Sequence, residues 1–374
     1  MDVLFKKEDI MEGVQKAYNI IPSKVGNYLR SIWIQAEDYE ISIMATDASI
    51  EFKGSYPIQT ASTFFIGVPS KSFVELLRKL SLGDVCLEIE ENKKTLTVKQ
   101  GKGKYALPVA DQMWFQPFTP FPEELAVTWL GYTFKDAIDK LYFCIADEDT
   151  IEGINCLSIK PVGSLVELCG LNGHQLAVLQ IEHEALAQAL PPEGILVHKK
   201  YIVELKKMLP ETEIDICFQN NRLHTKALEV SEHISLPISA YSYPEYKHFL
   251  DKLHAEGVST LKAPRKAVMD CLEKISIFNT ESNRCVYLQL TQNTVLFSVQ
   301  GFEVGTGEEE IEVEYTGSIE KIAFPTKNLI EILSKFTSET ITFLFTSIEG
   351  PCGIVGDDDA HYTVIIMPMK IAEK

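Results

Sequence analysis

The chain of 374 residues contains no apolar run long enough to cross a bilayer, and no apolar signal core follows Met1. Its eight cysteines form no Cys-x-x-Cys pair and mostly sit in apolar runs, which argues against a zinc site or a disulfide framework. Positive charge is scarce, with 35 Lys and Arg against 53 Asp and Glu and a net charge of −18. We therefore expect a cytoplasmic protein with no membrane contact, no metal and no cofactor, in which any contact with DNA is local.

The sequence does contain a pattern that occurs three times. Apolar residues follow helical spacing in segments that begin at Val68, Val197 and Phe324, and these starts are 129 and 127 residues apart. Ser70 and Thr326 are the expected capping residues of the first and third of these helices. A repeat of this length predicts three domains of one kind.

A second amphipathic helix opens each copy, over residues 8–18, 134–145 and 264–275, the last with Pro at its start. Between and after the helices, polarity alternates, which predicts strands with one buried and one exposed face, as in 31–36, 85–90 and 214–218. Turn residues gather near 117–122 and 254–257. We therefore predict an α+β fold of three repeated domains, each a sheet with two helices, over residues 1–123, 124–254 and 255–374.

The charge is divided unevenly between the helices and the rest of the chain. The six helical segments, taken as 6–17, 70–80, 135–146, 198–209, 264–276 and 326–337, hold 17 Lys and Arg against 10 Asp and Glu, a net of +7, and the remainder carries −25. Helices on one common face would let an acidic protein neutralise phosphates locally and without reading sequence. The alternative is that Lys is simply a good helix former on a wet face.

Three motifs are similar to those of one known family. They are Tyr362-Thr363-Val364-Ile365-Ile366-Met367-Pro368-Met369-Lys370-Ile371, Leu171-Asn172-Gly173-His174-Gln175-Leu176-Ala177 and Tyr243-Pro244-Glu245-Tyr246. In this order, and with three repeats, the chain resembles the bacterial sliding clamp, the beta subunit of DNA polymerase III. The resemblance implies the DNA clamp fold, a head-to-tail homodimer closed into a ring, and a processivity factor that encircles duplex DNA and catalyses nothing. The partners it implies are the alpha subunit of DNA polymerase III, the clamp loader, and other polymerases and repair proteins that bind through short peptide motifs.

The resemblance also implies three sets of site residues. The dimer seam joins a basic edge in domain 1 to an acidic one in domain 3, with an apolar part, and comprises Lys102, Lys104, Tyr105, Leu107, Ile277, Phe278, Glu308, Glu309 and Glu310. The partner-peptide pocket comprises Ile154, Leu157, Leu171, Gly173, His174, Gln175, Leu176, Pro244, His248, Phe249, Asn328, Ser347, Ile365, Met367, Pro368, Met369, Lys370 and Ile371. The cations expected to face DNA are Lys24, Lys71, Arg78, Lys79, Lys140, Lys199, Lys200, Lys206, Lys207, Arg265, Lys266 and Lys335. Gln175 and His248 depart from the family, which usually has Arg at both positions.

Two other functions stay open at the level of sequence. One is an enzyme of nucleic-acid metabolism built from repeated α+β domains, and the other is a peptide-binding scaffold that does not encircle DNA. The enzyme hypothesis lacks a constellation of catalytic residues. Gly101-x-Gly103 is followed by alternating residues rather than a helix, and His183-Glu184 lacks the second His of a metalloprotease helix.

Overall fold

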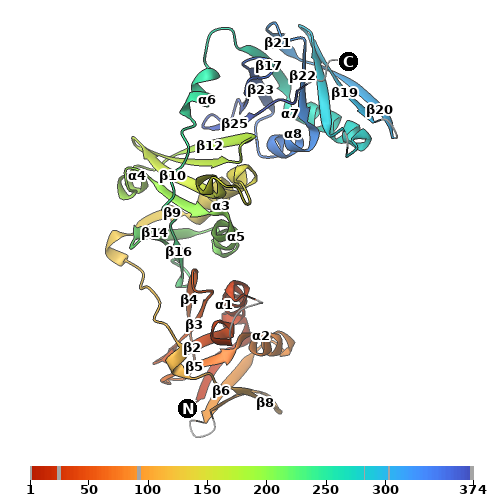
Figure 1. Cartoon of the computed structure of the whole chain (residues 1–374). Helices are drawn as coiled ribbons and strands as arrows, with labels where there is room; N and C mark the ends of the chain where they lie inside the picture. Colours follow the sequence, from red (N-terminus) through yellow and green to blue (C-terminus); the bar gives the residue numbers. More distant parts are fainter. Residues whose placement is uncertain (1, 23–26, 91–93, 282, 302–303, 371–374) are drawn as a thin grey trace. The chain divides into compact units, whose positions relative to one another are not determined.

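The computed structural model describes residues 2–22, 27–90, 94–281, 283–301 and 304–370. One order of elements occurs three times along the chain: a strand, a helix, strands, a second helix and three strands (Figure 1). The first repeat comprises β1 (Asp2–Lys6), α1 (Lys7–Ile20), β2 (Ser31–Glu37), β3 (Glu40–Thr46), β4 (Glu51–Pro57), β5 (Phe64–Pro69), α2 (Ser70–Lys79), β6 (Asp84–Glu90), β7 (Thr95–Gln100) and β8 (Gly103–Pro108).

The second and third repeats follow the same order with small insertions. The second comprises β9 (Val127–Leu130), α3 (Gly131–Leu141), β10 (Cys156–Val162), β11 (Leu165–Leu171), β12 (Gln175–Glu182), α4 (Glu184–Ala189), β13 (Ile195–His198), α5 (Lys199–Met208), β14 (Glu213–Gln219), β15 (Arg222–Ala227) and β16 (Glu232–Pro237). A linker with α6 (Lys247–Lys252) leads to the third. The third comprises β17 (Ser259–Pro264), α7 (Arg265–Ile275), β18 (Cys285–Leu290), β19 (Thr294–Gly301), β20 (Gly305–Glu312), β21 (Glu314–Thr316), β22 (Lys321–Pro325), α8 (Thr326–Leu333), β23 (Thr340–Phe345), β24 (Cys352–Gly356) and β25 (Tyr362–Ile366).

The chain forms two compact units, and the middle repeat contributes to both. Unit 1 is Met1–Lys135 with Lys200–Ile238, and unit 2 is Asp136–Lys199 with Ser239–Lys374. Unit 1 holds the sheets β5-β2-β3-β4-β16-β15-β14-β9 and β1-β6-β7-β8. Unit 2 holds the sheets β13-β10-β11-β12-β25-β24-β23-β17-β21 and β20-β19-β18-β22. This confirms the predicted α+β fold with two helices and sheet in each repeat.

Each long sheet runs without interruption through two repeats. The fourth strand of one repeat pairs antiparallel with the last strand of the next, β4 with β16 in unit 1 and β12 with β25 in unit 2. Phe52 lies opposite Ile234 at the first of these joints, and Leu176 opposite Ile365 at the second. Within the described part of the chain, β8 pairs only with β7 and β20 only with β19, so both are edge strands.

The helices bury one apolar face each, as their periodicity predicts. α1 packs on α2 and α7 on α8 (Figure 1), with Ile10 and Val14 of α1 and Phe73 of α2 fully buried. None of the helices in the described residues has the length and apolarity that crossing a membrane requires.

Two local predictions are wrong. Ser70 and Thr326 do not cap their helices, because each is the first helical residue and the preceding Pro69 or Pro325 occupies the cap position without a side-chain hydrogen bond. β2 does not alternate between buried and exposed positions. Its outward Trp33 is only 3% exposed because Phe65 stacks on it at 5.3 Å and Phe115 of the linker packs at 5.2 Å.

Buried ion pairs tie the first helix of a repeat to the next repeat. Lys16 is the tenth residue of α1, and its Nζ lies 2.5 Å from a Glu232 carboxylate oxygen of β16. Tyr56 donates to the other oxygen at 2.8 Å, and its ring fills the space that glycine leaves at position 13, where a Cβ would lie 1.7 Å from the Tyr56 hydroxyl. Burial alone lowers the pKa of Lys16, but its bonds to Glu232 and Glu12 outweigh burial and raise it.

The same position in the second repeat makes the same kind of contact. Lys140 is the tenth residue of α3, and its Nζ lies 3.8 Å from Asp359, a buried residue between β24 and β25. Tyr362 donates to the Lys140 carbonyl at 2.7 Å. Both intrachain joints are therefore fastened by a lysine of the preceding repeat.

Lys16→Met is expected to destabilise unit 1, because it leaves the Glu232 carboxylate buried without its cation. The expected loss is about 3 kcal/mol, seen as faster amide hydrogen exchange in β4 and β16. Glu12→Gln is the control, since the Glu12 side chain is 79% exposed and its pair with Lys16 contributes little. Equal effects of the two variants would contradict a structural role for the buried pair.

Candidate functional site

A tight turn between β11 and β12 forms one side of the predicted partner site in unit 2. The Asn172 side chain accepts hydrogen bonds from the backbone N–H groups of His174 at 3.1 Å and Gln175 at 2.8 Å. Gly173 has φ +82°, a conformation that glycine adopts without strain. This turn leaves His174 exposed at the joint of the second and third repeats.

The segment that follows β25 lies against this turn. The Met367 N–H donates to the His174 carbonyl at 3.0 Å, and the Met369 N–H donates to the Ala323 carbonyl of β22 at 2.8 Å. Pro368 stands between them and has no N–H to extend a ladder. Met369 is 44% exposed, so an apolar side chain is held on the surface by backbone bonds on either side of the proline.

An apolar cluster lies on the sheet beside this segment. Its buried members are Cys169, Leu176, Val178, Tyr246, Leu253 and Ile365. Leu171, Tyr243 and Phe249 pack on it and are partly buried. Tyr246 donates to Glu167 at 2.6 Å, and the Lys160 ammonium lies 4.3 Å from the Tyr246 ring centroid, so the linker is fixed to β10 and β11.

The structure brings together part of the predicted pocket. Residues 171–176, Ile365 and Met367 are contiguous through the turn, the β12–β25 pairing and the apolar cluster. His248 is exposed and packs on Phe249, with ring centroids 3.9 Å apart. Pro244 and Pro368 are half-buried, and Lys370 is exposed. Asn328 is half-buried in α8 and Ser347 is exposed in the loop after β23, and their membership stays a prediction, while Ile371 lies outside the described residues.

Two predicted wall residues lie in the core. Ile154 is 3% exposed and its carbonyl accepts the Ala146 N–H, while Leu157 is fully buried in β10 opposite Val197. Gln175 is 4% exposed, its Oε1 accepts from Asn172 at 3.1 Å, and its Nε2 is a buried donor with no partner in the described residues.

Unit 1 has an equivalent turn with the same hydrogen-bond pattern, but a different side chain lies at the corner beside it. Asp47 accepts N–H groups of Ser49 at 2.7 Å and Ile50 at 2.6 Å, and Ala48 has φ 78°, as in the unit 2 turn. Here the Arg222 guanidinium donates to the carbonyls of Ser49 at 2.7 Å and Ser235 at 3.0 Å. β24, the counterpart of β15, begins with Cys352 where β15 begins with Arg222, so a thiol replaces that guanidinium in unit 2.

The sequence analysis missed that the Met-Pro-Met segment has two internal counterparts. β8 ends at Pro108, within Leu107-Pro108-Val109, and β16 ends at Pro237, within Leu236-Pro237-Ile238. Relative to the backbone bond that follows, each of these prolines stands one position earlier than Pro368. Ala110 and Ser239 then donate to the strand before the second helix, to the carbonyls of Gly67 and Leu196, each at 2.8 Å. Comparing the ends of the three repeats would have revealed the proline-containing segment at the end of each one.

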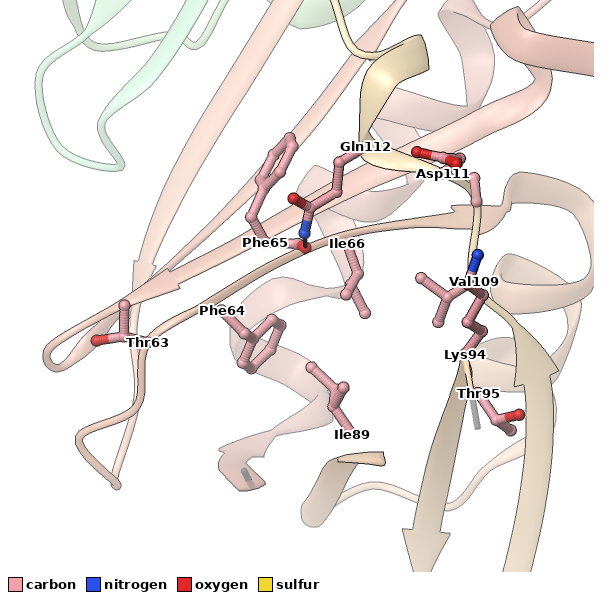
Figure 2. A pocket seen from close by; sticks show the side chains of 11 residues that line it. Thr63, Phe64, Phe65, Ile66, Ile89, Lys94, Thr95, Val109, Asp111 and Gln112 are labelled. Atoms are coloured by element: carbon pink, nitrogen blue, oxygen red, sulfur yellow. Dashed lines mark hydrogen bonds between the residues drawn. The ribbon is translucent and has the colours of Figure 1, made fainter. Parts of the chain in front are cut away.

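The counterpart in the first repeat borders a cavity of about 440 Å³, bounded by β5, β6 and the segment after β8 (Figure 2). Phe64, Ile66, Ile89 and Val109 form its apolar wall. At its rim, Gln112 donates to the Phe65 carbonyl at 2.5 Å and so occupies an acceptor on the free edge of β5.

The cations predicted to face DNA differ in exposure. Those with exposed side chains are Lys71, Arg78, Lys79, Lys200, Lys207 and Lys266. Lys206 and Lys335 are half-buried, and Lys24 lies outside the described residues.

Three cations predicted to face DNA make hydrogen bonds or ion pairs within their own units. Lys199 is 9% exposed, and its Nζ lies 2.6 Å from the Ile145 carbonyl and 2.8 Å from Asp147. Arg265 donates to the Ser338 carbonyl at 2.9 Å. Lys140 lies 3.2 Å from Asp136 as well as near Asp359. Lys199 and Arg265 satisfy carbonyls beyond the end of the neighbouring helix, so these positions serve the fold.

The edge strands β8 and β20, with the residues beside them, carry the predicted seam residues. On β8 and its turn, Lys102 and Lys104 are exposed, Tyr105 is 42% exposed and Leu107 is half-buried. Beside β20, Ile277 is 74% exposed and Phe278 is half-buried.

The acidic edge is divided between solvent and an internal pair. Glu308 and Glu310 are exposed on β20, whereas Glu309 pairs with Lys274 of its own chain at 2.5 Å. Glu309 therefore has a partner before any second chain arrives.

Nothing in the described residues assembles a catalytic centre from the motifs considered above. Gly101 and Gly103 lie in the β7–β8 hairpin. His183 caps α4, its Nδ1 accepting the Leu186 N–H at 3.1 Å. No group of three or more His, Cys, Asp or Glu in the described residues is placed to hold a metal ion.

Comparison with known proteins gives one consistent result. Residues 1–115 match the family description "DNA polymerase III beta subunit, N-terminal domain", and residues 255–370 match "DNA polymerase III beta subunit, C-terminal domain". The beta sliding clamp of Haemophilus influenzae is 21% identical over 379 residues, covering 99% of this chain and all of that protein. The beta sliding clamp of Pseudomonas aeruginosa is 21% identical, covering 99% of this chain and 98% of that protein.

Solved structures agree on the fold. The DNA polymerase III subunit beta of Pseudomonas aeruginosa superposes with a TM-score of 0.89 at 20% identity, covering 99% of this chain and all of that one. The sliding clamp of Caulobacter crescentus superposes with a TM-score of 0.88, also at 20% identity and with the same coverage.

Met369→Ser is expected to weaken binding of short peptides with apolar anchors by about tenfold, because it removes an apolar side chain that a ligand would bury. Val109→Ser is the control, since Val109 is an apolar residue of the corresponding segment in the first repeat. Both variants are measured by calorimetry with one peptide. Equal weakening by both would argue against a site at the end of β25.

Proposed function

The chain belongs to the DNA polymerase III beta subunit family, and from this membership we propose that it is a DNA sliding clamp. Two copies close head to tail into a ring around duplex DNA and hold a polymerase at its template. Tethering raises the effective concentration of the polymerase at the primer end, so the clamp confers processivity without catalysing a reaction. The role belongs in the cytoplasm, where bacterial DNA is copied.

The observation that carries the proposal is that β8 and β20 each have only one neighbouring strand in the described part of the chain. Within the chain, the fourth strand of a repeat pairs with the last strand of the next, as β4 with β16 and β12 with β25. β20 is the fourth strand of the third repeat and β8 the last strand of the first, and each is an edge strand in the described chain. The rule that built the two intrachain joints predicts that β20 of one copy pairs antiparallel with β8 of the next.

Side chains at these edges support that pairing. Leu96 and Val98 of β7 are buried, and their cross-strand partners Leu107 and Tyr105 lie on the same inner face at the open edge. Tyr105 of one copy and Ile277 of the other are thus apolar groups that a third joint would cover. On the outer face, Lys104 of one copy approaches Glu308 and Glu310 of the other, so unlike edges attract and like edges repel.

The DNA contact that we propose is electrostatic and independent of base sequence. It uses the exposed helical cations, with Lys206 and Lys207 at the end of α5 as representatives. Phosphate contacts of this kind hold the duplex loosely and let a closed ring slide. In the proposed ring these helices line the opening, and the acidic remainder of the chain lies away from the phosphates.

Partner proteins bind at the end of β25 in unit 2. A short peptide with apolar side chains fits a surface made of Met369, Met367 and the edge of the apolar cluster, because methionine adapts its shape to different ligands. The alpha subunit of the polymerase, the clamp loader, and other polymerases and repair proteins would compete for this surface. Domain boundaries at 123/124 and 254/255 complete the proposal, with one clamp domain for each repeat.

The proposed function has a topological test. Chains loaded by a clamp loader onto a nicked circular duplex are expected to stay bound in high salt, and to leave when a restriction enzyme cuts the circle, because a ring slides off a free end. Gel filtration of labelled protein with the DNA measures both. Equal retention on circular and linear DNA would refute encirclement.

The same assay separates the clamp from a scaffold that does not encircle DNA. Charge reversal at Lys206 and Lys207 lowers processive synthesis by a clamp, and would leave it unchanged for a scaffold.

Glu308→Lys combined with Glu310→Lys is expected to weaken the dimer by roughly tenfold at low salt, and by less at high salt because ions screen exposed charges. Analytical ultracentrifugation gives the dissociation constant. Lys102→Glu with Lys104→Glu in the same chain should restore the dimer by exchanging the signs. Glu309→Gln is the control, because Glu309 already pairs with Lys274 of its own chain. An unchanged dissociation constant for the Glu308→Lys, Glu310→Lys variant, with and without the two lysine substitutions, would contradict the proposed charged seam.

A further inference from the structure

One transverse row of outward residues crosses the joint in unit 1. Antiparallel register places Trp33 opposite Met44, Met44 opposite Lys53, Lys53 opposite His233, and His233 opposite Lys226. The row therefore begins with two large apolar side chains and continues with three basic ones across β4, β16 and β15. Cross-strand neighbours of this kind lie close enough to act on one ligand.

The linker of residues 109–126 runs along this row and covers its two ends. Phe115 packs on Trp33, and Phe121 packs on His233 with ring centroids 5.3 Å apart. Between these contacts a cavity of about 540 Å³ remains over Met44 and Lys53, with Phe118 on the linker side. The floor of the cavity is thus the centre of the row.

The equivalent row in unit 2 provides an internal comparison. It reads Ser158, Cys169, Val178, Thr363 and Val355, with no charged member. Tyr246 and Leu253 of the second linker pack into the same buried cluster as Cys169 and Val178. One joint is therefore sealed by apolar side chains, and the other is basic and open.

The basic groups of the unit 1 row are incompletely neutralised. Lys226 pairs with Glu123 of the linker at 2.6 Å. Lys53 is half-buried, and its ammonium group has no carboxylate partner within the described residues. Burial and the positive neighbours, His224 first, then Lys226, Arg222 and Lys53, lower the pKa of His233 to about 3. Glu40 is the other acidic residue that lines the cavity, four positions along β3 from Met44.

The geometry points to a second partner-binding site in this cavity, for an acidic peptide segment that places a carboxylate against Lys53 and an adjacent apolar side chain between Met44 and Phe118. A peptide is the ligand that fits, because the pocket joins one unpaired cation to apolar walls of side-chain size. The inference rests on the proposed function in one respect, that the chain exists to hold partner proteins. It does not depend on ring closure or on the site at the end of β25.

The experiment uses the full-length dimer with methyl-labelled methionine and two probes, acetyl-Asp-Phe-Asp-Phe-amide and its neutral counterpart acetyl-Asn-Phe-Asn-Phe-amide. The acidic probe is expected to shift the Met44 methyl resonance, assigned with Met44→Leu, and to bind at least about tenfold more tightly than the neutral probe, because a charge-assisted hydrogen bond is lost. Lys53→Met should weaken the acidic probe by a similar factor, and Lys53→Arg should retain binding.

Two controls locate the effect. Lys94→Met removes a lysine that lines the cavity beside β5 and β6 and should leave binding unchanged. Met369→Ser, which impairs the proposed site in unit 2, should also leave it unchanged. Equal binding of the two probes, indifference to Lys53→Met, or shifts confined to Met367 and Met369 would each overturn the second site. A negative result in the circular-DNA assay would overturn the clamp and leave these measurements standing.

Discussion

An antiparallel strand at the edge of a sheet leaves backbone N–H and C=O groups without partners, and the architecture of this chain follows from how those edges are satisfied. The second and third repeats each end in a strand that completes the sheet of the repeat before. Lysines at the tenth position of the first helices fasten these joints through Glu232 and Asp359. The third such lysine, Lys274, pairs with Glu309 of β20 in its own repeat. In the proposed ring, the third joint is therefore formed by groups that are exposed in the single chain.

The repeats share one backbone arrangement, so equivalent positions in the two units can differ in function through their side chains. The turns at Asp47 and Asn172 have one hydrogen-bond pattern, yet β15 begins with Arg222 in unit 1 and its counterpart β24 with Cys352 in unit 2. The linkers cross equivalent rows, and one row contains Lys53, His233 and Lys226 where the other is uncharged. Duplicated joints therefore give two surfaces of different chemistry, although the backbone is common to both.

The helices, most strands and the threefold order were predictable, because apolar periodicity reports directly on which face is buried. The failures came from contacts that periodicity does not encode. Lys199 looked like any cation at the start of a basic helix, but it is buried, and its ammonium group donates to the Ile145 carbonyl and pairs with Asp147. Ile154 and Leu157 matched a family pocket and yet lie in the core, since aliphatic residues serve a wall and its support equally well. The sequence pattern predicted one exposed face for β2. That face is covered at Trp33 because Phe115, from a linker some 80 residues later, packs on it.

The two open edges are chemically unlike, and this fixes a sense of direction. Copies that join only β20 to β8 all point the same way around the axis, so the assembly has cyclic symmetry and its two flat sides are different. A surface that occurs once per chain then appears on the same side in every copy. In the proposed ring, an enzyme docked on this surface meets the duplex from one side only, so the ring has a defined orientation relative to its partners.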